Sequence, residues 1–166
     1  AAACVFLTMA LSRRLWPQRY GIGGPAALIL VSCSLWTIFS TAAMFDVILA
    51  FFTLVGMHGT LKAAEGSTLR GVALLGLAIG LGVLAKGPVI LLHVLPVALL
   101  APWWKRHLRW LSWFGLLLLA VLLGATIALL WALPAGFAGG EAYRNAIFWG
   151  QTADRMVESF AHRRPL

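Results

Sequence analysis

Lys86 stands in the segment VLAKGPVI, where one charged side chain interrupts an apolar run and is followed directly by Gly87 and Pro88. An ionisable side chain at or near membrane depth is costly, and it commonly marks a functional site. The ammonium group of such a lysine can bind a phosphate. It can equally extend to the membrane surface and only anchor a helix, because the lysine stem is long and apolar. Both interpretations are open from the sequence.

Asp46 is the only Asp, Glu, Lys or Arg in the apolar run of residues 26–61. Its carboxylate can serve in catalysis as an acidic residue near a membrane face. It can also cap the N-terminus of the helix that follows, because short acidic side chains stabilise the first turn of a helix. The sequence leaves both roles open for Asp46.

The last segment of the chain, FWGQTADRMVESFAHRRPL, combines aromatic side chains with Arg155, His162, Arg163 and Arg164. The planar guanidinium group matches phosphate oxygens in a bidentate manner. Aromatic and polar residues mixed in this way are typical of an amphipathic segment on a membrane surface, where the same arginines would contact anionic lipid headgroups. Phosphate binding and surface anchoring therefore both fit this segment.

The composition identifies the surroundings in which these residues act. Hydrophobic residues make up 61% of the 166 residues and charged residues only 11%, and the apolar residues come in long unbroken runs. Such runs are typical of membrane-spanning helices and not of the amphipathic elements of a soluble protein. The sequence therefore predicts an all-α integral membrane protein. Because it begins inside an apolar stretch without a methionine, we expect it to be a fragment.

The net charge of +8 raises the question of a nucleic-acid partner. However, the basic residues fall in short clusters between apolar runs, as in the cytoplasmic loops of membrane proteins. This distribution argues against nucleic-acid binding. Cys4 and Cys33 lie in apolar segments without the spacing of a metal site or a disulfide framework, and we expect them only to pack.

The lengths of the apolar runs predict how often the chain crosses the membrane. Residues 1–12 form an incomplete span. The run of residues 26–61 would make a helix of about 54 Å at 1.5 Å per residue, against a bilayer core of about 30 Å, so it must contain two spans with a turn near SLWTIFSTAAMFD. Residues 111–133 form one further span.

The run of residues 71–101 is interpreted as two short spans that bend at KGP. With two crossings, all basic clusters lie on one side of the membrane, as the positive-inside rule requires. We therefore predict a membrane domain of about six spans over residues 1–133 and an outer-face, periplasmic segment over residues 134–166. Asp46 and Lys86 then share the outer face with that segment, whereas no role is predicted for His58, His93 or His107.

The order of these features resembles a known family. An Asp heads a span in FDVILAFF, a glycine-rich span runs into LAKGPV, a Trp/Lys/Arg loop follows, and the chain ends on FWGQTADRMVESFAHRRPL. This order is similar to that of the polytopic glycosyltransferases related to protein O-mannosyltransferases and to the 4-amino-4-deoxy-L-arabinose lipid A transferase. The resemblance covers essentially the whole chain.

The resemblance implies a multi-helix membrane domain of the GT-C type in the inner (plasma) membrane. The parent protein would move a sugar from a polyprenyl-phosphate donor to lipid A or protein on the outer face. Lys86, Arg155, Arg163 and Arg164 would bind the donor phosphate, since preorganised cations stabilise a departing phosphate. Asp46 matches a second acidic residue of the family.

The resemblance also implies limits to what this chain does alone. The main catalytic acid of the family lies in an outer loop before the segments seen here, so we expect the fragment by itself to be inactive. Similar enzymes use a divalent metal near their outer loops, for which His162 is the candidate ligand.

Two functions other than a transferase are also open from the sequence. In a transporter or flippase subunit, Asp46 and Lys86 would form a buried pair along a substrate path, and an inverted internal repeat would be expected. The sequence shows no such repeat. A non-catalytic membrane scaffold is the third interpretation.

Overall fold

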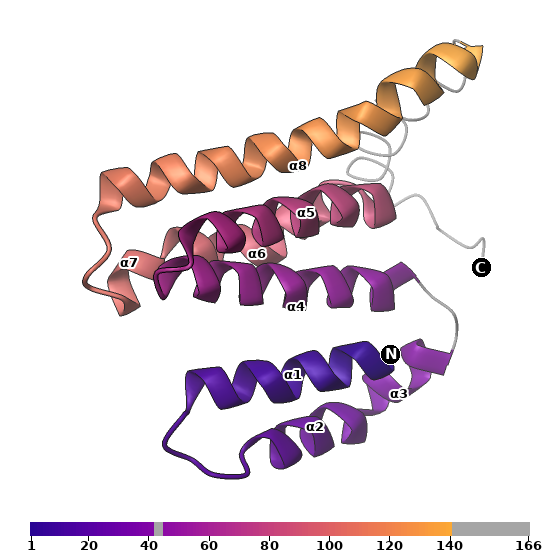
Figure 1. Cartoon of the computed structure of the whole chain (residues 1–166). Helices are drawn as coiled ribbons and strands as arrows, with labels where there is room; N and C mark the ends of the chain where they lie inside the picture. Colours follow the sequence, from indigo (N-terminus) through magenta and orange to yellow (C-terminus); the bar gives the residue numbers. More distant parts are fainter. Residues whose placement is uncertain (42–44, 141–166) are drawn as a thin grey trace, which may run out of the picture.

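Every regular element is an α-helix in the part of the chain that the structure describes, which is residues 1–41 and 45–140 of a computed structural model (Figure 1). The all-α fold predicted from the long apolar runs is therefore confirmed. The helices are α1 (Ala2–Leu15), α2 (Gly23–Ser32), α3 (Ser34–Thr41), α4 (Phe45–Ala64), α5 (Thr68–Lys86), α6 (Val89–Leu99), α7 (Ala101–Trp104) and α8 (Trp110–Ala138).

Within the described residues, α4, α5 and α8 are each long and apolar enough to cross a membrane. Helices α2 and α3 pass the same test together as one span broken by a 72° bend, while α6 and α7 form a shorter apolar segment, Val89–Trp104. Length and composition thus support a multi-span membrane protein. The number of about six crossings and the division at residues 133 and 134 stay predictions, and α8 continues through that division to Ala138.

Helices α4 and α5 form a closely packed hairpin whose turn contains Gly66 at φ +101°. A Cβ atom at Gly71 would lie 2.2 Å from the backbone nitrogen of Ala63, and one at Gly59 would lie 2.7 Å from the backbone nitrogen of Leu75. Glycines let two helix backbones approach this closely, as is common in membrane proteins. The contact fixes which residues of α4 and α5 face each other.

Helix α8 packs along α5 through a second set of glycines (Figure 1). A Cβ atom at Gly80 would lie 2.7 Å from Cβ of Ile127, and one at Gly124 would lie 2.6 Å from Cγ2 of Ile79. The two isoleucines therefore occupy the space that the glycines of the facing helix leave open. This reciprocal packing makes α5 the centre of the bundle.

The chain reverses between α5 and α6 at the KGP segment. Gly87 has φ +75°, in the left-handed region that favours glycine, and Pro88 precedes the first residue of α6. After the turn, Ile90 packs against Gly82. A Cβ atom added to Gly82 would lie only 2.6 Å from the Cγ1 atom of Ile90. Lys86 is consequently held at the end of a helix, immediately before a sharp turn.

A buried tryptophan joins α6 to α8. The indole nitrogen of Trp113 donates a hydrogen bond of 2.7 Å to the carbonyl oxygen of Ala98. Pro102, four residues after Ala98, has no N–H group with which to continue the helical pattern. The side chain of Trp113 therefore supplies a donor to this carbonyl where the helical pattern breaks.

Candidate functional site

Lys86 and Asp46 form an ion pair between the last residue of α5 and the second residue of α4. Each charge lies at the helix terminus where it interacts favourably with the helix dipole, the carboxylate at an N-terminus and the ammonium at a C-terminus. The Asp46 side chain keeps 48% of its surface exposed and the Lys86 side chain 30%, so the pair remains accessible. Asp46 therefore lies inside the first turn and pairs with Lys86.

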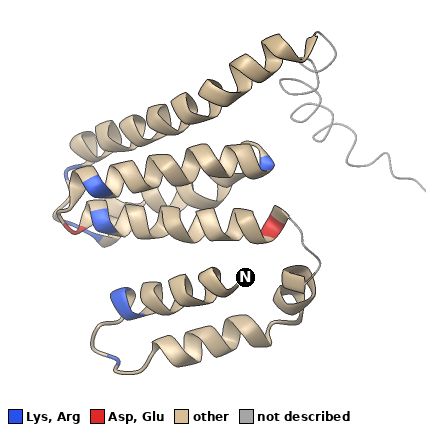
Figure 2. Ribbon diagram, turned by 45° about the vertical axis from the view of Figure 1, so that its right-hand side comes forward, with Lys and Arg blue, Asp and Glu red and all other residues tan. Residues whose placement is uncertain are grey.

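The rest of the basic residues of the described part lie at the other end of the bundle (Figure 2). We call this end the basic end and the opposite one the Lys86 end. The α1–α2, α4–α5 and α7–α8 connections meet at the basic end, whereas the start of α4 and the α5–α6 connection lie at the Lys86 end (Figure 1). The residues of the basic end are Arg13, Arg14, Arg19, Lys62, Arg70, Lys105, Arg106 and Arg109.

This charge distribution makes the Lys86 end distinctive. Lys86 is the one Lys or Arg residue there among the described residues, and Asp46 is the one Asp or Glu residue. An anion that approaches Lys86 meets an ammonium group whose partner is a partly exposed carboxylate. Such an arrangement can bind one phosphate group at the level where a helix reaches the membrane surface.

A groove of about 390 Å³ begins at Asp46 and continues down the bundle between α4 and its neighbours. Its wall is mostly apolar, and its polar members in addition to Asp46 are Thr8, Thr53 and His93. The Nδ1 atom of His93 lies 2.9 Å from the carbonyl oxygen of Val89, to which it must donate. The complete lining is Thr8, Leu30, Trp36, Asp46, Leu49, Ala50, Thr53, Leu54, Met57 and His93.

The other predicted site residues, Arg155, His162, Arg163 and Arg164, lie outside the described residues. Among residues 1–41 and 45–140, no group of three or more His, Cys, Asp or Glu side chains is arranged to hold a metal ion. The described residues do not supply a metal site, and we derive no step through a metal.

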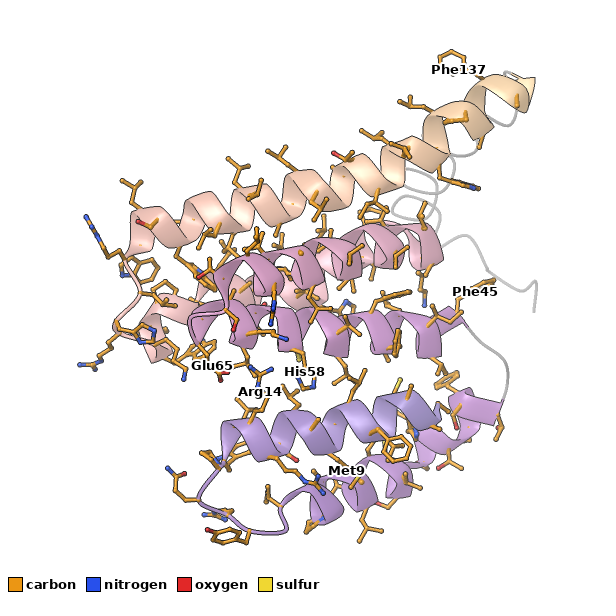
Figure 3. The ribbon with its side chains drawn as sticks, viewed as in Figure 1. Met9, Arg14, Phe45, His58, Glu65 and Phe137 are labelled. Carbon is orange, nitrogen blue, oxygen red and sulfur yellow. The ribbon has the colours of Figure 1, made fainter. Side chains whose placement is uncertain are left out.

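A polar network at the basic end was not predicted from the sequence (Figure 3). Arg14 of α1 forms an ion pair with Glu65, and its Nη1 atom lies 3.4 Å from Nδ1 of His58. The Nε2 atom of His58 lies 3.0 Å from the carbonyl oxygen of Leu7. These residues are 44 to 51 positions apart, and only the packing of α1 on α4 brings them together.

Comparison with known families identifies the class of protein to which the chain belongs. The family model of the dolichyl-phosphate-mannose-protein mannosyltransferases matches residues 1–146. The chain therefore belongs to this family of GT-C glycosyltransferases, and the resemblance found in the sequence is confirmed. No solved structure matches the chain.

Individual relatives carry a more specific name, undecaprenyl phosphate-alpha-4-amino-4-deoxy-L-arabinose arabinosyl transferase. The protein of Pseudomonas paraeruginosa is 35% identical over 170 residues, which cover 99% of this chain and 30% of that protein. That of Pseudomonas fluorescens is 31% identical, with 97% of this chain and 29% of the relative covered. That of Erwinia tasmaniensis is 29% identical, and the match covers 93% of this chain and 28% of that protein. The chain thus spans about 30% of the length of such relatives.

The position and exposure of the Asp46–Lys86 pair argue against the transporter interpretation. A transporter was expected to bury the Asp46–Lys86 pair along a path through the membrane. The two residues do pair, but they do so at helix ends and with nearly half of the Asp46 side chain exposed. This position suits a site at the membrane surface better than one at the membrane centre.

Proposed function

We propose that this chain is part of a larger membrane glycosyltransferase, which transfers a sugar from a polyprenyl-phosphate donor to an acceptor on the outer face of the inner membrane. The donor named for the relatives is undecaprenyl phosphate-linked 4-amino-4-deoxy-L-arabinose. Lipid A and protein are the two acceptor classes that we consider. The family to which the chain belongs supports the reaction type, and the position of Lys86 supports the site.

The position of Lys86 is the observation that carries the proposal. A polyprenyl phosphate keeps its tail in the bilayer and its phosphate at the interface, so its protein needs a cation at that depth. Lys86 ends α5 at the end of the bundle that lacks the arginine-rich loops, and by the positive-inside rule the basic end faces the cytoplasm. Lys86 would therefore meet the donor phosphate on the outer side.

In this proposal, Lys86 stabilises the negative charge that develops on the phosphate as the sugar leaves. Arg155, Arg163 and Arg164 would add guanidinium groups if the last segment of the chain lies over the helix ends. The general base for the acceptor would lie outside this chain, as the family resemblance implies. Asp46 is already paired with Lys86, and we do not assign it that role.

Substitution of Lys86 in the full-length protein tests the proposal. Lys86→Met keeps the apolar stem and removes the ammonium group, so insertion should persist while transfer and binding of undecaprenyl phosphate fall. Losing a charge-assisted hydrogen bond of roughly 1.5–3 kcal/mol corresponds to about a tenfold to hundredfold loss. Lys86→Arg should retain part of the activity, because the charge remains while its geometry changes.

Lys62→Met is the matched control, because Lys62 also lies in the last turn of a helix but at the basic end. It should express, insert and transfer sugar at close to the parental rate. Parental transfer and parental binding by a well-expressed Lys86→Met protein would contradict the proposal. Lys86 would then only anchor α5, and the phosphate would have to be held by the arginines of the last segment.

A further inference from the structure

Asp46 poses a question that the proposed phosphate site does not answer. A carboxylate in contact with Lys86 repels any phosphate that binds the same ammonium group, and so it weakens donor binding. The carboxylate is not needed to hold α4 and α5 together, because the backbones of these helices already meet at Gly59 and Gly71. A partly exposed ion pair adds little stability of its own. The Asp46 carboxylate thus opposes donor binding without being needed for packing, and its presence requires another explanation.

The charge of the carrier changes during the proposed reaction. An oxygen atom of the acceptor, from a hydroxyl or a phosphate group, forms a bond to the anomeric carbon of the sugar. The bond from that carbon to the carrier phosphate breaks, its electron pair stays on the phosphate oxygen, and any proton on the acceptor oxygen passes to a general base. The donor is a phosphodiester with one negative charge, whereas the spent carrier is a phosphomonoester with about 1.5 to 2 charges at pH 7.

We propose that Asp46 promotes release of the spent carrier, because its carboxylate repels the more highly charged product more strongly than the donor. This inference rests on the proposed function, in which Lys86 binds the carrier phosphate. Asp46 acts through the charge that it places beside Lys86, and it is neither the catalytic base nor a ligand of the sugar.

The geometry gives the size of the expected effect. Both anions would contact the same ammonium group of Lys86, so their charges would lie within about 6 Å of each other. Even at the dielectric constant of water, this repulsion weakens binding roughly threefold for one phosphate charge and about tenfold for two. Asp46 would therefore lower the affinity for the product about threefold more than that for the donor.

The groove that begins at Asp46 agrees with this role. Asp46 lies both in the wall of the groove and against Lys86, so a lipid whose phosphate reached Lys86 would pass the carboxylate on entering and on leaving. His93 is a further titratable residue in that wall, on α6. Because its protonation would also act on a phosphate, the test below is made at one fixed pH.

Two lipid probes that differ in phosphate charge test the inference in the full-length protein. The probes are undecaprenyl phosphate, which represents the product, and its methyl phosphodiester, which carries one charge like the donor. Dissociation constants are measured by equilibrium binding in detergent for the parent, Asp46→Asn and Asp46→Glu. Glu65→Gln is the matched control, because it removes the charge of the ion pair at the basic end.

We expect Asp46→Asn to bind undecaprenyl phosphate about tenfold more tightly and the methyl diester only about threefold more tightly. In turnover, the same variant should show stronger inhibition by undecaprenyl phosphate and a lower kcat, because product release becomes slower. Asp46→Glu keeps the charge and should restore the parental ratio of the two constants. Glu65→Gln should leave both constants unchanged. A change in folding alone would change the dissociation constants of both probes by the same factor.

The inference is wrong if Asp46→Asn leaves the ratio of the two dissociation constants at the parental value, or if it weakens binding of the monoester. The Lys86→Met variant separates this failure from failure of the proposed function. If Lys86→Met loses affinity for both probes while Asp46→Asn leaves their ratio unchanged, only the role of Asp46 is refuted. If Lys86→Met binds both probes like the parent, the phosphate site itself is refuted.

Discussion

His58 is buried where α1 packs against α4, and its two ring nitrogens have different partners. Arginine can only donate, so Nδ1 of His58 accepts from Arg14, and the Nε2–H group donates to the carbonyl oxygen of Leu7. The imidazole ring thereby links two helices that lie far apart in the sequence. It has a structural role at the basic end.

Replacing His58 tests this role. His58→Leu fills much of the same space but removes both hydrogen bonds, so the free energy of unfolding should fall by about 1–3 kcal/mol. Thermal unfolding of the full-length protein in detergent measures the loss. His93→Leu is the control, since His93 is exposed and bonds to a carbonyl of its own helix, and it should unfold like the parent. Equal unfolding temperatures for both variants would contradict the role.

At the residue scale, the sequence identified Lys86 and Asp46 as candidates because charged side chains are rare in apolar runs. It could not show that they pair, since they are 40 positions apart and their contact depends on the register of the α4–α5 hairpin. The histidines show the same limit. The sequence predicts no role for His58, and its partner Arg14 could not be found without the position of α1.

The register of the α4–α5 hairpin depends on two glycines at which a larger residue would be strained. At Gly71, an added Cβ atom would meet backbone atoms of Ala63, which cannot move aside as a flexible side chain could. The neighbouring turn at Gly66 requires a positive φ of +101°. Together these two glycines set the alignment that brings Asp46 to Lys86 at the far ends of the helices.

Gly71→Ala should therefore lower the free energy of unfolding by about 1–3 kcal/mol or more, the usual cost of overpacking. The reason is that α4 and α5 must separate to make room for the Cβ atom. Gly115→Ala is the matched control in α8, where an added Cβ atom meets nothing within 4 Å. That change should be neutral or stabilise by up to about 1 kcal/mol, because alanine favours helix. Unfolding of both variants in detergent is the measurement. Equal stability of the two would argue against the close hairpin.

The elements themselves were largely predictable, because apolar runs that are too long for one crossing must be broken. The run of residues 26–61 is indeed divided, into α2, α3 and α4. The chain also reverses at Gly87, within the KGP segment, as the sequence predicted. The 72° bend between α2 and α3 could not be predicted. It falls at Cys33, between two serines, where no glycine or proline marks a break.

The whole molecule is organised by the separation of its charges. The chain reverses its direction from one span to the next, and the basic clusters follow every second span. The basic loops therefore gather at one end of the bundle. The sequence predicted this separation from the positions of the clusters alone. Short segments such as α6–α7, Val89–Trp104, cannot be counted as crossings from length alone, because a span needs about 20 residues.

The proposed transfer on the outer face requires that the Lys86 end and the basic end lie on opposite sides of the membrane. Single cysteines test this directly in the full-length protein, after Cys4 and Cys33 have been replaced by alanine. Phe45→Cys reports on the Lys86 end, where Phe45 is 67% exposed beside Asp46, and Arg106→Cys reports on the basic end. Phe45 begins α4 and Arg106 lies in the connection between α7 and α8, so both are outside the closely packed glycine contacts.

Labelling with a membrane-impermeant thiol reagent in intact spheroplasts is the measurement. We expect Phe45→Cys to react in intact spheroplasts and Arg106→Cys to react only after the membrane is broken. Gln151→Cys, which lies outside the described residues, should behave like Phe45→Cys. If Arg106→Cys reacts in intact spheroplasts while Phe45→Cys requires lysis, the Lys86 end faces the cytoplasm, and a phosphate site there cannot serve transfer on the outer face.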